Sequence, residues 1–387
     1  MRCPTLADAR ELLAWRPPLG VVSVYLEIDP ADRRGGWRTA LRNALDDLVE
    51  ATDDREHRAR VTLRDCAGRV PERFAEADHD NLGRGQVGFV EVAGRNGEER
   101  WWRTQLPLPG PTCAYLSSAP VLAPLVDLAG RSAPRGAVVL SAERIRLFER
   151  TPGHLEELHD WELTLFSGEW RERKAPTVAP LHTRGVSASG RDQNAERLDH
   201  NRQRFLTECG QLVRAAGSER DWPEVVAFGT PPEVERFVAG IPAADSPSLV
   251  AGPAVDLVSE PSTVVLEQVE RAFADLDAER DRRLVERTLG EIRPGGRATG
   301  GVEETEAALV MARVEHLVVA GGLAPLDPPC EDHWPGGSDD SGDDSVSAGS
   351  EPLVRRALCS GAEVSVVDAG AAELLNPFDG VAALLRY

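Results

Sequence analysis

Lysine is almost absent from this chain of 387 residues, because Lys174 is the only one and the rest of the 44 basic residues are arginines. A nucleotide-binding loop of the Gly-x-x-x-x-Gly-Lys type requires a lysine directly after its glycines, and no such motif is present. The sequence therefore excludes a Walker-type phosphate loop. Arginine, in contrast, is the residue best suited to bidentate phosphate contacts.

Long apolar runs are also absent, and no stretch reaches the roughly 18 residues that a membrane-spanning helix needs. The opening residues 1–10 contain no long apolar core, which is unlike a secretory signal. We therefore expect a cytoplasmic protein with no membrane partner.

Cysteine is scarce and scattered. The six cysteines form no Cys-x-x-Cys pair, so we expect small buried side chains rather than a disulfide framework. His154 and His159 are spaced i, i+5, whereas a zinc-binding helix needs i, i+4. Cys330, His333 and Cys359 are too few for a zinc site, although shared ligands would be compatible with them. There is no Gly-x-Ser-x-Gly elbow. No cofactor or metal is expected.

The overall composition is that of a folded globular protein, with 41% hydrophobic and 28% charged residues. The length predicts two or three domains. The net charge of −20 argues against general nucleic-acid binding, since phosphate contacts depend on basic residues.

Hydrophobic periodicity divides the chain into three parts of mixed α/β and α+β class. Residues 1–132 form an N-terminal α/β domain of unclear function, with strands at 20–28 and 85–92 and helices at 37–50 and 55–75. In this part Gly83-Arg-Gly-Gln86 is interpreted as a turn that runs into the second strand.

Residues 133–258 begin with a three-stranded meander at 136–141, 144–149 and 154–163. An exposed loop is predicted over 167–192, followed by a helix at 193–216, a strand at 225–228 and a further helix. Residues 259–387 form a C-terminal α/β layer with a long helix at 262–292. Its acidic, low-complexity stretch 335–350 is predicted to be disordered.

The C-terminal part carries a family resemblance. Gly300-Gly-Val-Glu-Glu-Thr-Glu-Ala-Ala-Leu and the terminal Gly380-Val-Ala-Ala-Leu-Leu-Arg-Tyr387 resemble the C-terminal domain of the release-factor and Pelota family. This domain is related to the kink-turn-binding ribosomal proteins. The resemblance implies a bacterial member of the archaeal and eukaryotic class-I peptide chain release factor superfamily.

The central part resembles the same family. Its release factors carry Gly-Gly-Gln on a loop before a long, arginine-rich helix, and here the corresponding segment reads Gly190-Arg-Asp-Gln193. Gln193 and Gly190 match the family's catalytic positions, while Arg191 and Asp192 depart from the pattern. Such relaxed forms resemble the ribosome-quality-control branch, which hydrolyses peptidyl-tRNA. No Asn-Ile-Lys-Ser motif is present, so stop-codon reading is not expected.

The predicted loop and helix are locally basic. Residues 171–204 contain eight basic and four acidic side chains, which favours contact with phosphates. Gln193, Arg197, Asn201 and Arg204 share one face of the helix, whereas Leu198, Phe205, Cys209 and Leu212 share the face that we expect to pack inward. The predicted RNA-binding residues are Arg184, Arg191, Arg197, Arg202 and Arg204.

Two functions follow from the resemblance. The first is a ribosome-associated peptidyl-tRNA hydrolase that rescues stalled ribosomes, with Gln193 in the peptidyl-transferase centre. Its partners would be the ribosomal A site, rRNA and peptidyl-tRNA, with a translational GTPase as a further candidate. The alternative is a non-catalytic factor that occupies the A site, like Balon-type hibernation factors. An RNA-binding adaptor without a ribosomal role is a weaker third option.

Overall fold

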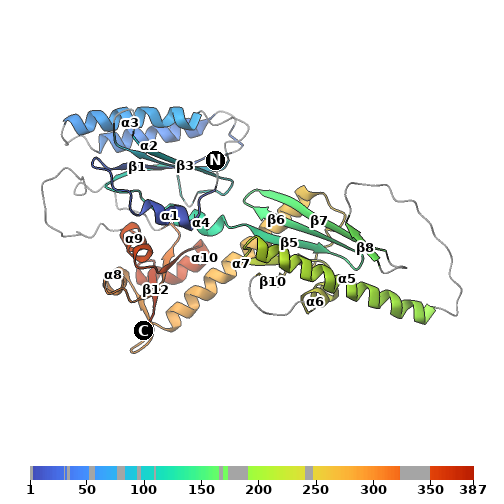
Figure 1. Cartoon of the computed structure of the whole chain (residues 1–387). Coiled ribbons are helices and arrows are strands. Elements are labelled where there is room, and N and C mark those ends of the chain that lie inside the picture. Colours follow the sequence, from blue (N-terminus) through green and yellow to red (C-terminus); the bar gives the residue numbers. More distant parts are fainter. Residues whose placement is uncertain are drawn as a thin grey trace. The chain divides into compact units, whose positions relative to one another are not determined.

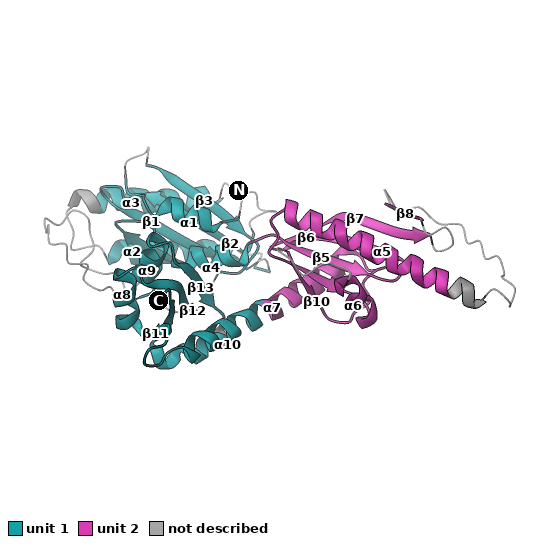
Figure 2. Cartoon of the chain, turned by 60° about the horizontal axis from the view of Figure 1, so that its bottom comes forward, with its two compact units in different colours: residues 1–132, 277–387 teal, residues 133–276 magenta. Residues whose placement is uncertain are grey.

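The computed structural model divides the chain into two compact units, residues 1–132 with 277–387 and residues 133–276 (Figure 2). It describes residues 3–29, 31–32, 35–51, 57–75, 83–93, 97–108, 110–164, 169–172, 191–239, 247–322 and 349–387. The chain is of mixed α/β class, as expected. The division into three domains at 132/133 and 258/259 stays a prediction, because compactness alone does not show which parts fold independently.

The first lobe of unit 1 is an antiparallel sheet with strand order β3-β2-β1-β4. Its strands are β1 (Val21–Glu27), β2 (Gly85–Glu91), β3 (Glu99–Thr104) and β4 (Cys113–Ser117). Helices α2 (Gly36–Glu50) and α3 (His57–Ala75) cover one face, where Leu41, Leu45 and Leu63 join a buried cluster (Figure 1). Helices α1 (Leu6–Leu12) and α4 (Ala123–Arg131) pack in a different cluster.

The predicted elements of this lobe are all present, and Gly83 does lie in a turn, with φ of 73°. Gln86 is buried within β2, which confirms that Gly83-Arg-Gly-Gln86 is not an exposed catalytic loop. Strands β3 and β4 and helix α4 were not predicted. Their sequences explain this: β3 reads Glu-Arg-Trp-Trp-Arg-Thr and shows no regular alternation of polar and apolar residues.

The second lobe of unit 1 is a four-stranded mixed sheet with order β11-β14-β12-β13. Strands β12 (Val314–Ala320) and β13 (Glu363–Val367) are parallel, whereas β11 (Ala298–Gly300) and β14 (Val381–Leu385) pair antiparallel. Helices α8 (Val302–Val310), α9 (Glu351–Cys359) and α10 (Ala369–Ala372) surround this sheet, and a 3₁₀ helix, η3 (Glu373–Phe378), precedes β14. The predicted disordered stretch 335–350 lies outside the described residues, apart from its last two.

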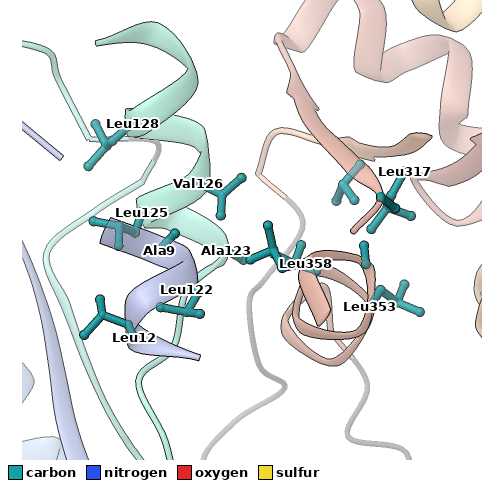
Figure 3. Packing of buried hydrophobic residues seen from close by; sticks show 14 of the residues in the cluster. Ala9, Leu12, Leu122, Ala123, Leu125, Val126, Leu128, Leu317, Leu353 and Leu358 are labelled. Carbon is teal, nitrogen blue, oxygen red and sulfur yellow. The ribbon is translucent and has the colours of Figure 1, made fainter. Parts of the chain in front are cut away.

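The two lobes of unit 1 share one hydrophobic core. Side chains of α1 and α4, such as Leu12 and Leu125, belong to the same buried cluster as Leu353 and Leu358 of α9 and Leu317 of β12 (Figure 3). We call this contact the lobe seam. Two polar groups of α9 are among those that cross it. A carboxylate oxygen of buried Glu351 accepts hydrogen bonds from the N–H groups of Leu122 (2.6 Å) and Ala123 (2.8 Å), and the Arg355 guanidinium donates to the carbonyl oxygen of Pro120.

Unit 2 is a six-stranded mixed sheet with order β10-β9-β5-β6-β7-β8. The predicted meander is confirmed as β5 (Arg135–Leu140), β6 (Arg144–Thr151) and β7 (His154–Thr164), all antiparallel neighbours. Strands β9 (Glu224–Phe228) and β10 (Ser248–Ala251) extend the sheet in parallel to β5.

Helices cover both faces of this sheet. Helices α5 (Arg191–Glu219) and α6 (Pro231–Ala239) pack in one buried cluster, with Phe205 and Phe237. The first half of α7 (Ser262–Gly290) packs on the opposite face through Val265, Val269 and Phe273. Its second half contributes Val285 to unit 1. Unit 2 is therefore a three-layer α/β/α arrangement.

Two expectations are wrong. The predicted exposed loop 167–192 contains strand β8 (Glu169–Glu172), whose Trp170 packs against Trp161 and Phe205. A single apolar residue in a polar segment gave no periodicity from which a strand could be recognised. The cysteines are also not uniformly buried, since Cys359, at the last position of α9, is exposed.

Candidate nucleic-acid interface

Helix α5 carries the predicted interface and spans 29 residues. Its packing face is formed by Phe205, Leu206, Cys209 and Val213, which are all almost completely buried. Leu212, which the sequence placed on the inward face, is 40% exposed. The buried stripe runs through Val213 instead, so that Leu212 lies at its margin. The opposite face of the helix is left to polar and charged residues.

The helix begins at Arg191, two residues before the predicted start. Gln193 is therefore the third residue of α5 and lies in its first turn rather than at the end of a loop. The side chains of residues 191–195 are outside the described part of the structure, as are Gly190 and Arg184. The proposed pairing of Gly190 with Gln193 thus stays a prediction from sequence.

Arg197, Arg202 and Arg204 are described, and they differ in environment. Arg197 is exposed and has no carboxylate within ion-pair distance among the described residues. Arg202 is half-buried and donates a hydrogen bond of 2.8 Å to Glu143. The guanidinium of Arg204 lies 3.6 Å from Glu208, one helical turn away. An exposed pair such as Arg204–Glu208 contributes little stability, so Arg204 can exchange this partner for a phosphate.

Helix α6 adds a basic residue that was not among the predicted RNA-binding residues. The Arg236 guanidinium lies 3.5 Å from the Asp199 carboxylate of α5, and both side chains are more than half exposed. This contact places a further arginine beside the exposed face of α5. The sequence signal for it was the apolar spacing of Val234 and Phe237, which fixes the outward face of α6.

The other face of the sheet holds arginines of a different kind. Arg144, Arg146 and Arg150 alternate along β6 and each makes two hydrogen bonds to one carboxylate, of Asp160, Glu157 and Glu270 respectively. Arg144 and Arg146 also donate to backbone carbonyls in the segment before α7, at Val258 (3.1 Å) and Glu260 (2.7 Å). Hydrogen bonding to Asp160 raises the pKa of Arg144. These side chains hold the α7 layer on the sheet.

Metal binding finds no support in the part of the chain that the structure describes, where no group of three or more His, Cys, Asp or Glu side chains is placed to hold an ion. His154 and His159 lie on strand β7, which confirms that they are not a zinc helix. The ring of His159 stacks on Trp161 and its Nδ1 lies 2.6 Å from Glu172. None of the described helices is long and apolar enough to cross a membrane.

The central domain matches a known family. Residues 120–274 fit the sequence model of bacterial archaeo-eukaryotic release factor family 10, and this range covers nearly all of unit 2. This part of the chain is therefore similar to a release-factor domain. The match includes the whole of α5 and the exposed arginines described above. No curated protein matches the chain significantly.

Solved structures of a termination factor and of Pelota-type proteins are similar to the chain at low identity. The archaeal translation termination factor is 18% identical over 99% of this chain and 97% of its own, with a TM-score of 0.26. Pelota of Archaeoglobus fulgidus is 13% identical over 78% of this chain and 79% of its own (TM-score 0.34). Dom34 of S. cerevisiae, a translation termination-like factor, is 10% identical over 80% and 82% (TM-score 0.42).

Proposed function

We propose that this protein is a ribosome-associated, release-factor-like protein that hydrolyses peptidyl-tRNA on stalled ribosomes without reading a stop codon. The observation that carries the proposal is the release-factor match over residues 120–274, because its long helix α5, which carries five arginines, has Gln193 in its first turn. In the family that the sequence resembles, the glutamine before this helix enters the peptidyl-transferase centre.

The first turn of α5 supplies a suitable chemistry. Backbone N–H groups in the first turn of a helix have no acceptor within the helix and carry partial positive charge. The N–H of Gln193 is one of these groups. It would stabilise the negative charge that develops on the ester carbonyl oxygen when water attacks, an effect worth roughly 3–4 kcal/mol per donor in enzymes. The Gln193 amide would orient the water.

Docking would use the exposed face of the same helix. Arg197, Arg202 and Arg204 recur along α5, and none of them is locked into a buried pair. Guanidinium groups with this freedom suit phosphates of rRNA and tRNA. The proposed partners are therefore the ribosomal A site and peptidyl-tRNA, with a translational GTPase as the resemblance implies.

A specific observation favours a second function, in which the protein occupies the A site without catalysis. Asp192 precedes Gln193 in the first turn of α5. Acidic residues are favoured in this position because a helix N-terminus attracts negative charge. An aspartate there would compete with the oxyanion for the free N–H groups. A protein with this second function would bind ribosomes as tightly as the hydrolase but would release no peptide.

Peptide release from stalled ribosome–nascent-chain complexes distinguishes the two functions. For a hydrolase, Gln193→Ala lowers the release rate by roughly 10²-fold or more, the scale for one positioned catalytic contact. Ribosome co-sedimentation stays the same, because one neutral side chain adds little to electrostatic docking. Asp192→Gly, which restores a Gly-Gln step, releases peptide at least as fast as the wild type. If all three proteins bind ribosomes and none releases peptide, hydrolysis is wrong and A-site occupation is supported.

A further inference from the structure

The lobe seam of unit 1 contains a partly open cavity of about 260 Å³. One wall comes from β4 and α4 of the first lobe, with Cys113, Tyr115 and Ala123. The other comes from β12 and α9 of the second lobe, with Val319 and Val354. The cavity therefore lies between segments that are some 200 residues apart in sequence, inside a single compact unit.

The lining is mainly apolar. Leu108, Pro124 and Val366 complete the apolar walls, and Tyr25 contributes an aromatic ring. The Tyr25 hydroxyl is already used, since it donates to the carbonyl oxygen of Val121 at 2.5 Å. Burial raises the pKa of the neighbouring Cys113 thiol and of the Tyr115 hydroxyl. Both groups thus stay neutral at physiological pH.

The charge of the cavity is balanced. Asp127 is the one ionisable acid or base among the described lining residues, apart from the neutral tyrosines and cysteine. Its two carboxylate oxygens accept hydrogen bonds from Arg131 at 3.0 and 2.8 Å. Because this carboxylate already has its cation, the cavity offers no net charge to an ionic ligand. Burying an unpaired ion there would be strongly unfavourable.

The volume sets the size of an occupant. An apolar protein cavity of about 150 Å³ holds benzene, which has six carbon atoms. On the same scale, a cavity of about 260 Å³ accommodates roughly ten non-hydrogen atoms. Ser350 and Tyr115 add polar side chains to the lining, and Tyr115 is hydrogen-bonded to Cys113.

We propose that this cavity is a binding site for a neutral, mainly aromatic small molecule of about ten non-hydrogen atoms that carries one hydrogen-bonding group. The site is separate from the α5 surface and does not depend on ribosomal function. Since its walls come from both lobes, a bound molecule stabilises their association by mass action.

Indole is a suitable probe, because it is neutral, bicyclic and has one N–H donor. We expect indole to raise the melting temperature of the full-length protein saturably, by about 3 °C at ten times its Kd. The charged analogue indole-3-carboxylate should have no such effect. Val354→Trp fills the cavity and should abolish the response, whereas Val310→Trp, the same change at an exposed position of α8, should keep it. No rise with the wild type, or equal rises with wild type and Val354→Trp, would overturn the proposal.

Alkylation of cysteines gives a second readout that needs no variant. Cys113 lines the cavity, whereas Cys359 is exposed at the end of α9. Indole at ten times its Kd should slow the modification of Cys113 by iodoacetamide about tenfold. The modification rate of Cys359 should stay the same, as followed by peptide mass spectrometry. Unaltered rates at both cysteines would contradict the site even if Val354→Trp failed to fold.

Discussion

The two faces of the central sheet use arginine in opposite ways. Towards α7, the side chains of Arg135, Arg146 and Arg150 are only 4–6% exposed and each lies against a carboxylate. Arg135 and Arg150 also lie over the ring of Phe273. On α5, Arg197 is exposed and Arg204 is 47% exposed. The first set connects layers of the fold, and the second faces solvent.

This difference shows that arginine count does not define a nucleic-acid surface. A buried guanidinium is held by fixed acceptors, and removing one of them leaves a charge without compensation. An exposed guanidinium loses little interaction free energy when its partner changes. Charge in this protein therefore has to be assessed by burial and partner, and four predictions test this distinction.

The largest effect is expected at the buried pair of Arg135 and Glu224, which are 3.1 Å apart with side chains 4% and 5% exposed. Glu224→Ala should lower the free energy of unfolding by roughly 3–5 kcal/mol, because the Arg135 charge stays buried. Urea unfolding measures this loss. A decrease below about 1 kcal/mol, the range of exposed pairs, would mean that burial does not distinguish the two classes.

The second effect concerns Glu351 at the lobe seam, a buried charged group in unit 1. Burial, opposed by Arg355 and by the N–H groups of Leu122 and Ala123, raises the pKa of Glu351 from 4.5 to about 7, and Tyr25 also faces this carboxylate. The folded state thus binds a proton more tightly than the unfolded state. Stability contributed by this group is full below about pH 4.5 and is lost as the pH rises through 7, by up to about 3 kcal/mol.

Glu351→Gln should remove this dependence, because the amide does not titrate and its oxygen can still accept from α4. Urea unfolding between pH 4.5 and 8 compares the two slopes. Identical slopes for wild type and Glu351→Gln would show that Glu351 does not titrate in this range.

The third effect is on binding. Replacing Arg197 and Arg204 by Glu should weaken ribosome association by about tenfold and reduce its salt dependence by about one unit of slope for each phosphate that the variant no longer binds. The matched control is Arg282→Glu with Arg283→Glu, at exposed positions of α7 that also pair with neighbouring glutamates. Equal losses in both double variants would indicate a general charge effect, and the α5 surface would lose its assigned role.

The smallest effect is expected for Glu208→Ala, which removes the exposed partner of Arg204. We expect the free energy of unfolding to change by less than about 1 kcal/mol, as for other exposed pairs. Glu208 also accepts a hydrogen bond of 2.8 Å from Trp170. A change as large as that of Glu224→Ala would therefore show that Trp170 depends on this carboxylate to hold β8.

The parts of the fold that sequence predicted best are those with strong local patterns. The β-branched runs at β1, β9 and β12 were recognised, as was the helical spacing of Trp37, Leu41 and Leu45. Strands such as β3 and β8 were missed because tertiary neighbours, not local periodicity, determine them. β8 pairs with β7, and its Trp170 contacts residues from β7 and α5.

For the candidate site, the sequence predicted which segment carries it but not the contacts of its side chains. Sequence located the basic helix, but neither the ion pairs of Arg202 and Arg236 nor the exposure of Leu212 follows from spacing. Each depends on which residues of β6, α5 and α6 meet in space. The cavity at the lobe seam was likewise invisible, since its walls come from distant segments that share no motif.

Helix α5 is held unevenly along its length. Among its described side chains, the first buried one is Phe205, so that all the anchoring core residues lie in the second half of its 29 residues. About 20 Å of helix precedes this anchor, at a rise of about 1.5 Å per residue. That segment has no buried apolar side chain among those that the structure describes, so its helical state depends on propagation from the anchored half. Its amides should exchange with solvent hydrogen much faster than those near Cys209. Loss of helix before Phe205 would therefore leave the buried cluster beneath α5 intact.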